Sequence, residues 1–110
     1  MAKGLIIRKE WLDKILNNGK HWEMRSTHTK QRGVVKLIEA GRGLIVGECM
    51  IAGSHEVTDD LAKQNFSAHQ VDDLILLKKW RYAWRLCNVK KYKQPVPYKH
   101  PKGAVIWVNL

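Results

Sequence analysis

The sequence predicts an α+β domain built on a small, partly closed β-barrel of five to six strands with two to three short flanking helices. The 110 residues have the length of one domain, so we expect residues 1–110 to form a single domain. Hydrophobic residues make up 45% and charged residues 27%, which is typical of folded globular proteins. The apolar runs are short and often preceded by glycine, and closing a small sheet protects its strand edges.

The first third of the chain predicts a strand, a helix and a second strand. Residues 4–8 are short and β-branched after a glycine, which favours a buried strand. Residues 9–18 form a helix that ends at an Asn-Asn-Gly stop. Polar and apolar side chains alternate in residues 22–25, which indicates a short strand. The helix carries one apolar stripe, formed by Trp11, Leu12, Ile15 and Leu16.

A β-hairpin follows a polar loop. Residues 26–32 contain no apolar side chain and predict the loop. Residues 33–38 and 44–52 predict two strands joined by a Gly-Arg-Gly turn. Gly47 indicates a bulge or bend in the second of these strands.

Two short helices and two strands complete the chain. Asp59 and Asp60 can cap a short helix that ends near Asn65, and Ser67 can cap another that ends near Leu77. Alternation predicts a strand over residues 81–90, and Pro95 and Pro97 argue against its continuing as a central strand. Residues 104–109 predict the last strand.

The cysteines and the hydropathy exclude several classes of protein. Cys49 and Cys87 lack metal-ligand spacing, so we interpret them as two buried thiols rather than a disulfide or a metal pair. No apolar run approaches the roughly 20 residues of a membrane span, and no signal-peptide core follows Met1. We therefore expect a cytoplasmic protein without a membrane partner.

The positive charge is concentrated in the last third. The chain has 20 Lys+Arg and 10 Asp+Glu, a net charge of +10. Residues 74–110 contain nine of the basic residues and no acid. Basic residues interleaved with aromatic rings suit a nucleic acid whose bases can stack, and a solvated strand face with ordinary core tryptophans is the alternative. The aromatic residues concerned are Trp80, Tyr82, Trp84, Tyr92 and Tyr98.

The densest polar cluster lies between the first helix and the second strand. Glu23 and Arg25 project from one face of an extended strand, and the Lys20 ammonium could reach over that face. A carboxylate between two cations can recognise a polar heterocycle through hydrogen bonds. The carboxylate accepts from amino groups, and the cations donate to carbonyl or phosphate oxygens. An ordinary surface ion-pair cluster is the alternative.

This cluster and three further blocks resemble the ASCH-domain family, whose fold is PUA-like. The motif is Gly-Lys-x-x-Glu-x-Arg, from Gly19 to Arg25. The resemblance implies a β-barrel surrounded by helices, a cleft lined by Lys20, Glu23 and Arg25, and a link to RNA binding or nucleic-acid metabolism. The other similar blocks are 33–35 with 44–49, 82–86, and 95–97 with 102–107.

The resemblance also implies an enzymatic alternative. Some small bacterial members resemble ribonucleases or an amidohydrolase that removes the acetyl group from N4-acetylcytidine. In the amidohydrolase type a lysine matched by Lys20 activates a threonine three residues later, and this chain has Glu23 there. The threonine nucleophile is therefore missing, and Lys20 and Glu23 are the catalytic candidates of this alternative. A further acid of that type falls somewhere in residues 67–73.

The remaining candidates extend the site without adding a cofactor. The five histidines lack metal-ligand spacing, and no glycine-rich phosphate loop is present, so we expect no metal and no cofactor. The partner we expect is RNA or a nucleoside or nucleotide, and an acidic protein bound by the basic surface is a third hypothesis. The candidate ligand-binding residues are Lys20, His21, Trp22, Glu23, Arg25, Trp84 and Arg85. His21 could instead be a plain turn residue, and Trp22, Trp84 and Trp11 could instead belong to the core.

Overall fold

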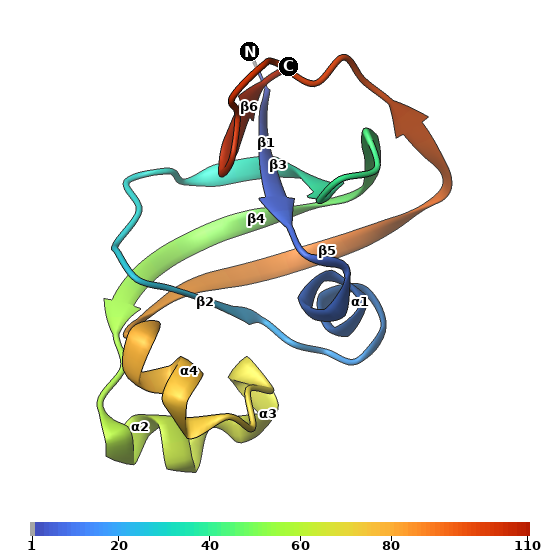
Figure 1. The fold of residues 1–110 in the computed structure, drawn as a ribbon. Coiled ribbons are helices and arrows are strands. Elements are labelled where there is room, and N and C mark those ends of the chain that lie inside the picture. The colour runs from blue at the N-terminus through green and yellow to red at the C-terminus, as the bar shows by residue number, and fades with distance from the viewer. Residues whose placement is uncertain (1) are drawn as a thin grey trace.

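The computed structural model describes residues 2–110 as a six-stranded sheet, curled into a half-barrel, with four helices (Figure 1). The strand order is β2-β5-β4-β3-β1-β6. Strand β1 pairs in parallel with β3, and the other neighbours are antiparallel. This α+β half-barrel confirms the predicted fold class. The elements are β1 Lys3–Ile7, α1 Lys9–Asn17, β2 Trp22–Arg25, β3 Gly33–Glu39, β4 Leu44–Glu56, α2 Asp59–Gln64, α3 Phe66–His69, α4 Leu74–Lys79, β5 Tyr82–Pro97 and β6 Trp107–Asn109.

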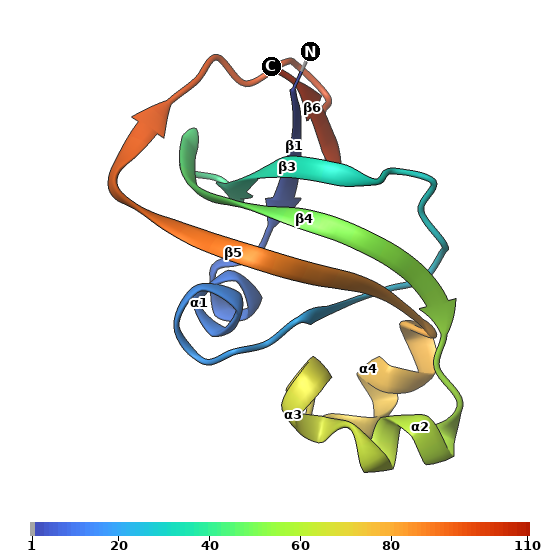
Figure 2. The ribbon, with the colours of Figure 1, turned by 180° about the vertical axis from the view of Figure 1, so that it is seen from behind.

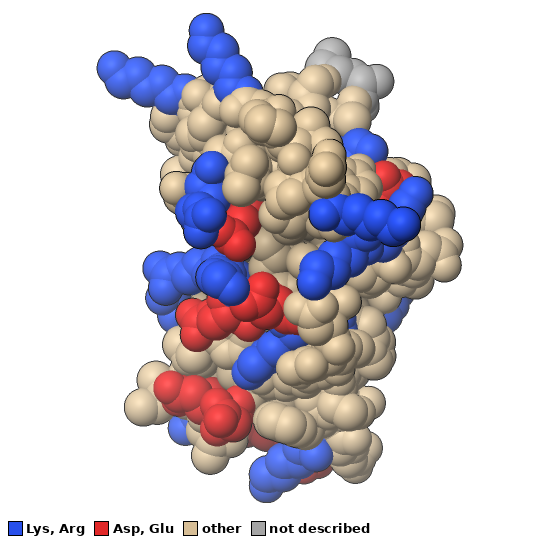
Figure 3. Space-filling view, turned by 90° about the vertical axis from the view of Figure 1, so that its right-hand side faces the viewer, with Lys and Arg blue, Asp and Glu red and all other residues tan. Residues whose placement is uncertain are grey.

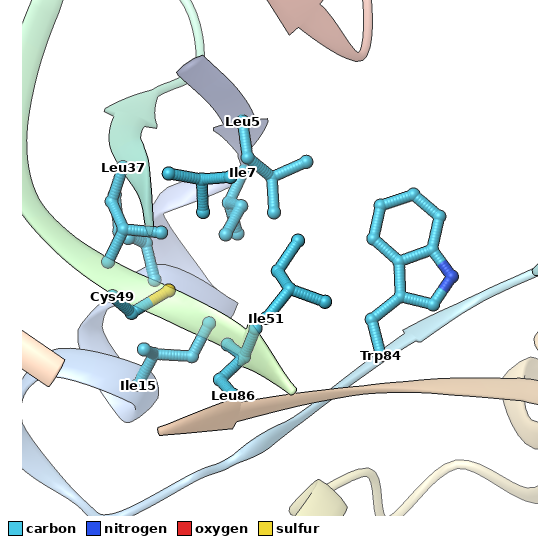
Figure 4. Packing of buried hydrophobic residues seen from close by; sticks show 10 residues of the cluster. Leu5, Ile7, Ile15, Leu37, Cys49, Ile51, Trp84 and Leu86 are labelled. Carbon is cyan, nitrogen blue, oxygen red and sulfur yellow. The ribbon is translucent and has the colours of Figure 1, made fainter. Parts of the chain in front are cut away.

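The main core fills the inside of the curled sheet, which we call the inner face. Leu12 and Ile15 of α1 pack there against side chains from four strands. Figure 4 shows Leu5 and Ile7 of β1 near Ile51 of β4, with Trp84 of β5 to one side. The predicted apolar stripe of α1 therefore packs on the inner face of the half-barrel. The buried cluster comprises Leu5, Ile7, Leu12, Ile15, Val35, Leu37, Cys49, Ile51, Trp84 and Leu86.

A second cluster lies on the opposite, outer face at one end of the sheet. Met24 of β2 and Ala83 of β5 are buried there with Ala62 of α2 and the nearby Val57 and Val71. Helices α2, α3 and α4 lie together below β2 and beside the ends of β4 and β5 (Figures 1 and 2). The two clusters thus bury both faces of the sheet where β2 pairs with β5.

The helix predicted from Ser67 to Leu77 is two helices in the structure. Helix α3 ends at Gln70, whose φ of 54° is left-handed, and Asp73 caps α4 by accepting from the Ile75 N–H. The prediction was wrong because the 70–73 segment caps both helices instead of continuing one. Helix α2 begins after Thr58, whose hydroxyl accepts from Leu61 N–H, rather than after Asp59.

Strand β5 is longer than predicted. It continues to Pro97, and Leu44 of β4 pairs with Pro97. Strand β2 pairs only with residues 82–85 of β5, so beyond that point β5 is an edge strand, where a residue without an N–H is tolerated. The last strand is shorter than predicted and begins at Trp107.

Two other expectations concern the thiols and the membrane. Cys49 is buried as predicted, whereas Cys87 is exposed, because the alternation of β5 turns it to the outer face; both thiols are free. In the part of the chain that the structure describes, no helix is both long enough and apolar enough to cross a bilayer.

Candidate functional site

The alternation of β2 and β5 divides the predicted site between the two faces of the sheet. Glu23 pairs with Trp84, and both lie on the inner face. Trp22 pairs with Arg85, and both lie on the outer face. The seven predicted ligand-binding residues therefore do not share one surface.

A cleft of about 290 Å³ lies beside the free edge of β2. Its polar lining comes from Arg8, which precedes α1, and from Glu23 and Arg25 of β2. Its apolar lining comes from β1, α1, β2, the turn after β3, the residue after α4 and the segment before β6. These apolar residues are Ile6, Trp11, Met24, Ala40, Trp80, Val105 and Ile106.

Glu23 and Arg25 form a fixed ion pair in this cleft. Glu23 Oε2 accepts from Arg25 Nε at 3.1 Å and lies 2.9 Å from Nη2. Arg25 Nη2 also donates to the Ile6 carbonyl at 3.0 Å, which ties β2 to β1. Glu23 is a buried residue, and its Oε1 has no protein partner; since no fully buried side-chain oxygen or nitrogen among residues 2–110 lacks a partner, Oε1 is not fully buried. The cleft thus presents a carboxylate oxygen that can accept a hydrogen bond.

Two tryptophans form a wall of the cleft. The rings of Trp11 and Trp80 meet edge to face, with centroids 5.8 Å apart. Helix α1 supplies Trp11, and Trp80 ends α4, so the wall depends on the packing of two helices that are far apart in sequence. Such an apolar wall suits a flat aromatic ligand.

Lys20 lies behind that wall and does not line the cleft. Its side chain is buried, and Nζ donates to the carbonyls of Trp22, at 2.7 Å, and of His69. Nζ also lies 5.4 Å from the centroid of Trp11. Burial lowers the pKa of Lys20 from 10.5 to about 8, and the nearby Glu23 carboxylate opposes that shift. The ammonium therefore lies beneath the Trp11 ring, and the prediction that it reaches over the face of Glu23 and Arg25 was wrong.

Trp84 lies in the core and supports Arg25. Its ring is 3% exposed, its Nε1 donates to the Thr27 carbonyl at 2.8 Å, and it stacks on Trp107 at 5.7 Å. The Arg25 guanidinium carbon lies 5.3 Å from the Trp84 centroid. A buried ring of this kind orients the cation above it.

His21, Trp22 and Arg85 lie outside the cleft. His21 is exposed in the turn before β2, and its Nδ1 lies 3.1 Å from the Gly19 carbonyl. Trp22 and Arg85 are half-buried on the outer face. Within residues 2–110 no group of three His, Cys, Asp or Glu side chains could hold a metal ion.

Sequence reasoning missed three parts of the cleft. Arg8 was predicted only to end the first strand, and Trp80 only to be one of the aromatic residues among the basic residues of 74–110. Both line the cleft. Val105 and Ile106 were read as strand residues, yet they border the cleft and are exposed. In the sequence, Val105 to Val108 are consecutive large apolar residues that cannot all face one side of a strand, and this is the one signal that could have identified the last two.

The fold and the cleft define a class: a half-barrel α+β domain with a ligand-sized cleft between its first helix and an edge strand. The chain belongs to the ASCH domain family, whose model matches residues 5–96, and this confirms the resemblance seen in the sequence. No curated protein matches the chain in sequence.

Solved ASCH structures share this fold. The chain is similar to the crystal structure of ASCH from Zymomonas mobilis, with a TM-score of 0.73 and 9% identity, over 99% of this chain and 87% of that one. It is also similar to a point mutant of the Zymomonas mobilis protein, with a TM-score of 0.70 and 10% identity, over the same shares of the two chains. At these identities the likeness concerns the fold.

Proposed function

We propose that this ASCH protein binds single-stranded RNA and holds one base in the cleft beside β2. The observation that supports this most is the unpartnered Oε1 of Glu23 at an apolar cleft with a tryptophan wall. A carboxylate oxygen accepts from the amino or imino group of a base, and ASCH domains are suggested to bind RNA in general. The cleft volume is at the lower end of the range for small-molecule sites, which suits one base.

Cations near the cleft suit the phosphates of the same strand. Arg8 is exposed and lines the cleft. Lys99 and Lys102 lie in the connection that leads directly to Val105 and Ile106. Figure 3 shows Lys and Arg side chains projecting over much of the side where α1 and the far end of β5 lie, with Asp and Glu between them. The connection that carries these two lysines therefore ends at residues that border the cleft.

The variant Glu23→Gln tests this proposal. It replaces the acceptor by an amide of similar shape, and a hydrogen bond to a charged group contributes about 1.5–3 kcal/mol, so we expect affinity for a short single-stranded RNA to fall about 10- to 100-fold. Fluorescence anisotropy at low salt measures it.

The matched control is Glu48→Gln. Glu48 also belongs to an ion pair, with Lys36 on β3, but it does not line the cleft. We expect this control to bind RNA like the wild type. Equal affinity of Glu23→Gln and the wild type, or no binding of RNA at low salt, would contradict the proposal.

A small hydrolase is the second candidate, favoured by the lowered pKa of Lys20, although the ammonium lies behind the wall of the cleft and donates to two backbone carbonyls. A lysine whose pKa is about 8 is partly neutral near neutral pH, as a general base requires, and Glu23 lies close by. Purified wild type and Lys20→Met should be assayed on N4-acetylcytidine and on RNA. Turnover by the wild type that the variant loses while still folded would support catalysis, and no turnover would exclude it for these substrates.

A further inference from the structure

The guanidinium of Arg85 lies on the outer face of the sheet, on the other side of β2 and β5 from the cleft. In the register of the sheet, Trp22 pairs with Arg85 and Arg85 pairs with Gly53 of β4. Arg85 Nη1 lies 2.8 Å from Nδ1 of His55, two residues further along β4. Three adjacent strands therefore contribute to one surface cluster, which we call the Arg85 cluster: Trp22, Gly53, His55 and Arg85.

The absence of a side chain at Gly53 gives the guanidinium its position. A Cβ at Gly53 would lie 1.9 Å from Arg85 Nη2 and 2.7 Å from Cζ. The guanidinium thus occupies the space that a side chain at Gly53 would fill, and a methyl group there would displace it. Because Arg85 is flexible at that end, the displacement need not disturb the sheet.

Arg85 has a histidine as its partner, whereas three other arginines have a carboxylate. Arg25, Arg42 and Arg81 each form an ion pair with an acid, whereas the ion pairs among residues 2–110 do not include Arg85. Its remaining N–H groups have no protein acceptor within that part of the chain. The positive charge of the cluster is therefore not neutralised by a contacting acid.

His55 adds a donor to the cluster. Burial lowers the pKa of His55, and Arg85 and then His28 lower it further, so the neutral ring predominates at neutral pH. Since Nδ1 accepts from Arg85, the proton of the neutral ring is on Nε2. The Trp22 ring meets His55 edge to face at 4.7 Å and provides an apolar side to the cluster.

We propose that the Arg85 cluster is a phosphate-binding site, separate from the base cleft, which binds a phosphate group of a nucleotide. A guanidinium held in one orientation donates two parallel hydrogen bonds to phosphate oxygens. The aromatic rings of Trp22 and His55 lie beside it, where a sugar or a base attached to that phosphate can pack. The proposal stands on these contacts and does not depend on base binding in the cleft.

NMR of the whole protein tests the proposal. We follow the side-chain Nε–H of Arg85 and the ring signals of His55 while adding inorganic phosphate, a short RNA with a 5′-phosphate, or the same RNA with a 5′-hydroxyl. Saturable shifts of both groups support the site. A response to the 5′-phosphate RNA alone identifies a terminal phosphate, a response to both RNAs identifies the backbone, and a response to inorganic phosphate alone shows binding of the free ion only and overturns the proposal for a nucleotide. No response to any of the three overturns the proposal.

Two variants distinguish binding by the oriented Arg85 guanidinium from non-specific electrostatic attraction of phosphate. Arg85→Gln removes the guanidinium, whereas Gly53→Ala keeps the charge and displaces the group. We expect both to weaken binding at least tenfold, as measured by the remaining His55 shifts. Arg81→Gln, which removes the same charge from an arginine paired with Asp59, should bind like the wild type.

The outcomes also distinguish this site from the cleft. If Gly53→Ala binds phosphate as well as the wild type, the oriented guanidinium is not needed and the proposal is overturned. Glu23→Gln should keep the phosphate response, and Arg85→Gln should keep the binding of a nucleoside that has no phosphate. Each proposal can therefore fail without the other. Thermal unfolding of every variant confirms that it is folded.

Discussion

Lys20 has the most unusual environment of any charged side chain near the cleft. Its ammonium is buried beneath Trp11 and donates to two backbone carbonyls, one from β2 and one from the end of α3. Those contacts join the edge strand to the helices on the outer face. Burial nevertheless lowers its pKa to about 8, so the protonated form costs stability in the folded state.

This cost predicts a specific pH dependence of stability. The pKa of Lys20 is about 8 in the folded protein and near 10.5 in an unfolded chain, so between these values the unfolded state binds more protons and stability rises with pH. Relative to Lys20→Met, the free energy of unfolding of the wild type should rise by about 3 kcal/mol across this window. Urea denaturation at pH 7 to 10.5 measures it.

The comparison needs a lysine in water as a control. Lys99 is exposed, and Lys99→Met should follow the wild type with a constant difference over the same pH range. A difference between the wild type and Lys20→Met that does not change with pH would mean that the buried amine does not titrate there.

At the scale of elements, bulges in β5 bend this long strand so that it follows the curvature of the sheet. Between Glu48 and Met50 of β4 there is one residue, but between their partners Lys90 and Cys87 there are two. Asn88 is one of those two and has a φ of 51°, in the left-handed region that asparagine tolerates. This bulge bends β5 as it leaves the region paired with β2.

The bulge predicts opposite effects of two substitutions. Asn88→Gly should leave stability unchanged or slightly higher, because glycine adopts positive φ freely. Asn88→Val should lower it by about 1–2 kcal/mol, because a β-branched residue is strained there. Chemical denaturation of both variants gives the comparison. Lys90→Val, at a nearby strand position without positive φ, should not lose stability; a similar loss there would show that the strain is not specific to Asn88.

At the scale of the whole molecule, the net charge of +10 is expected to determine how RNA binding responds to salt. On binding, each phosphate neutralised by a cation releases counterions, with a slope of about −0.7 in log K against log salt per contact for single strands. The cations that adjoin the cleft should therefore contribute to the slope, and distant ones should not.

The pair Lys99 and Lys102 tests this. The double variant Lys99→Gln/Lys102→Gln should reduce the magnitude of the slope by about 1.4, because two phosphate contacts are lost. Anisotropy titrations with single-stranded RNA at several salt concentrations measure the slope. Lys30→Gln/Lys63→Gln removes the same charge from other exposed positions and should leave it unchanged. If the two double variants have equal slopes, the binding does not use the connection before β6.

The sequence predicted most of the elements because their signals are local. The alternation of β2, the stripe of α1 and the Gly-Arg-Gly turn depend on neighbours along the chain, and each lies where it was predicted. The prediction of one helix from Ser67 to Leu77 was wrong because residues 70–73 interrupt it. Gln70 adopts a left-handed conformation that ends α3, and Asp73 caps the start of α4. The sequence did not predict that β5 continues to Pro97, because whether a strand lies at the edge or in the centre of a sheet depends on its neighbours.

By itself the sequence determined the fold class and the family resemblance, and it predicted that Lys20, Glu23 and Arg25 line one cleft. Only the tertiary structure decided which of these side chains meet. It buried Lys20 and Trp84, put Arg8, Trp80 and Ile106 around Glu23, and turned Trp22 and Arg85 to the other face. The reason is physical: spacing along one strand fixes the face of each residue, whereas burial and the opposite wall of a cleft depend on elements far away in the chain.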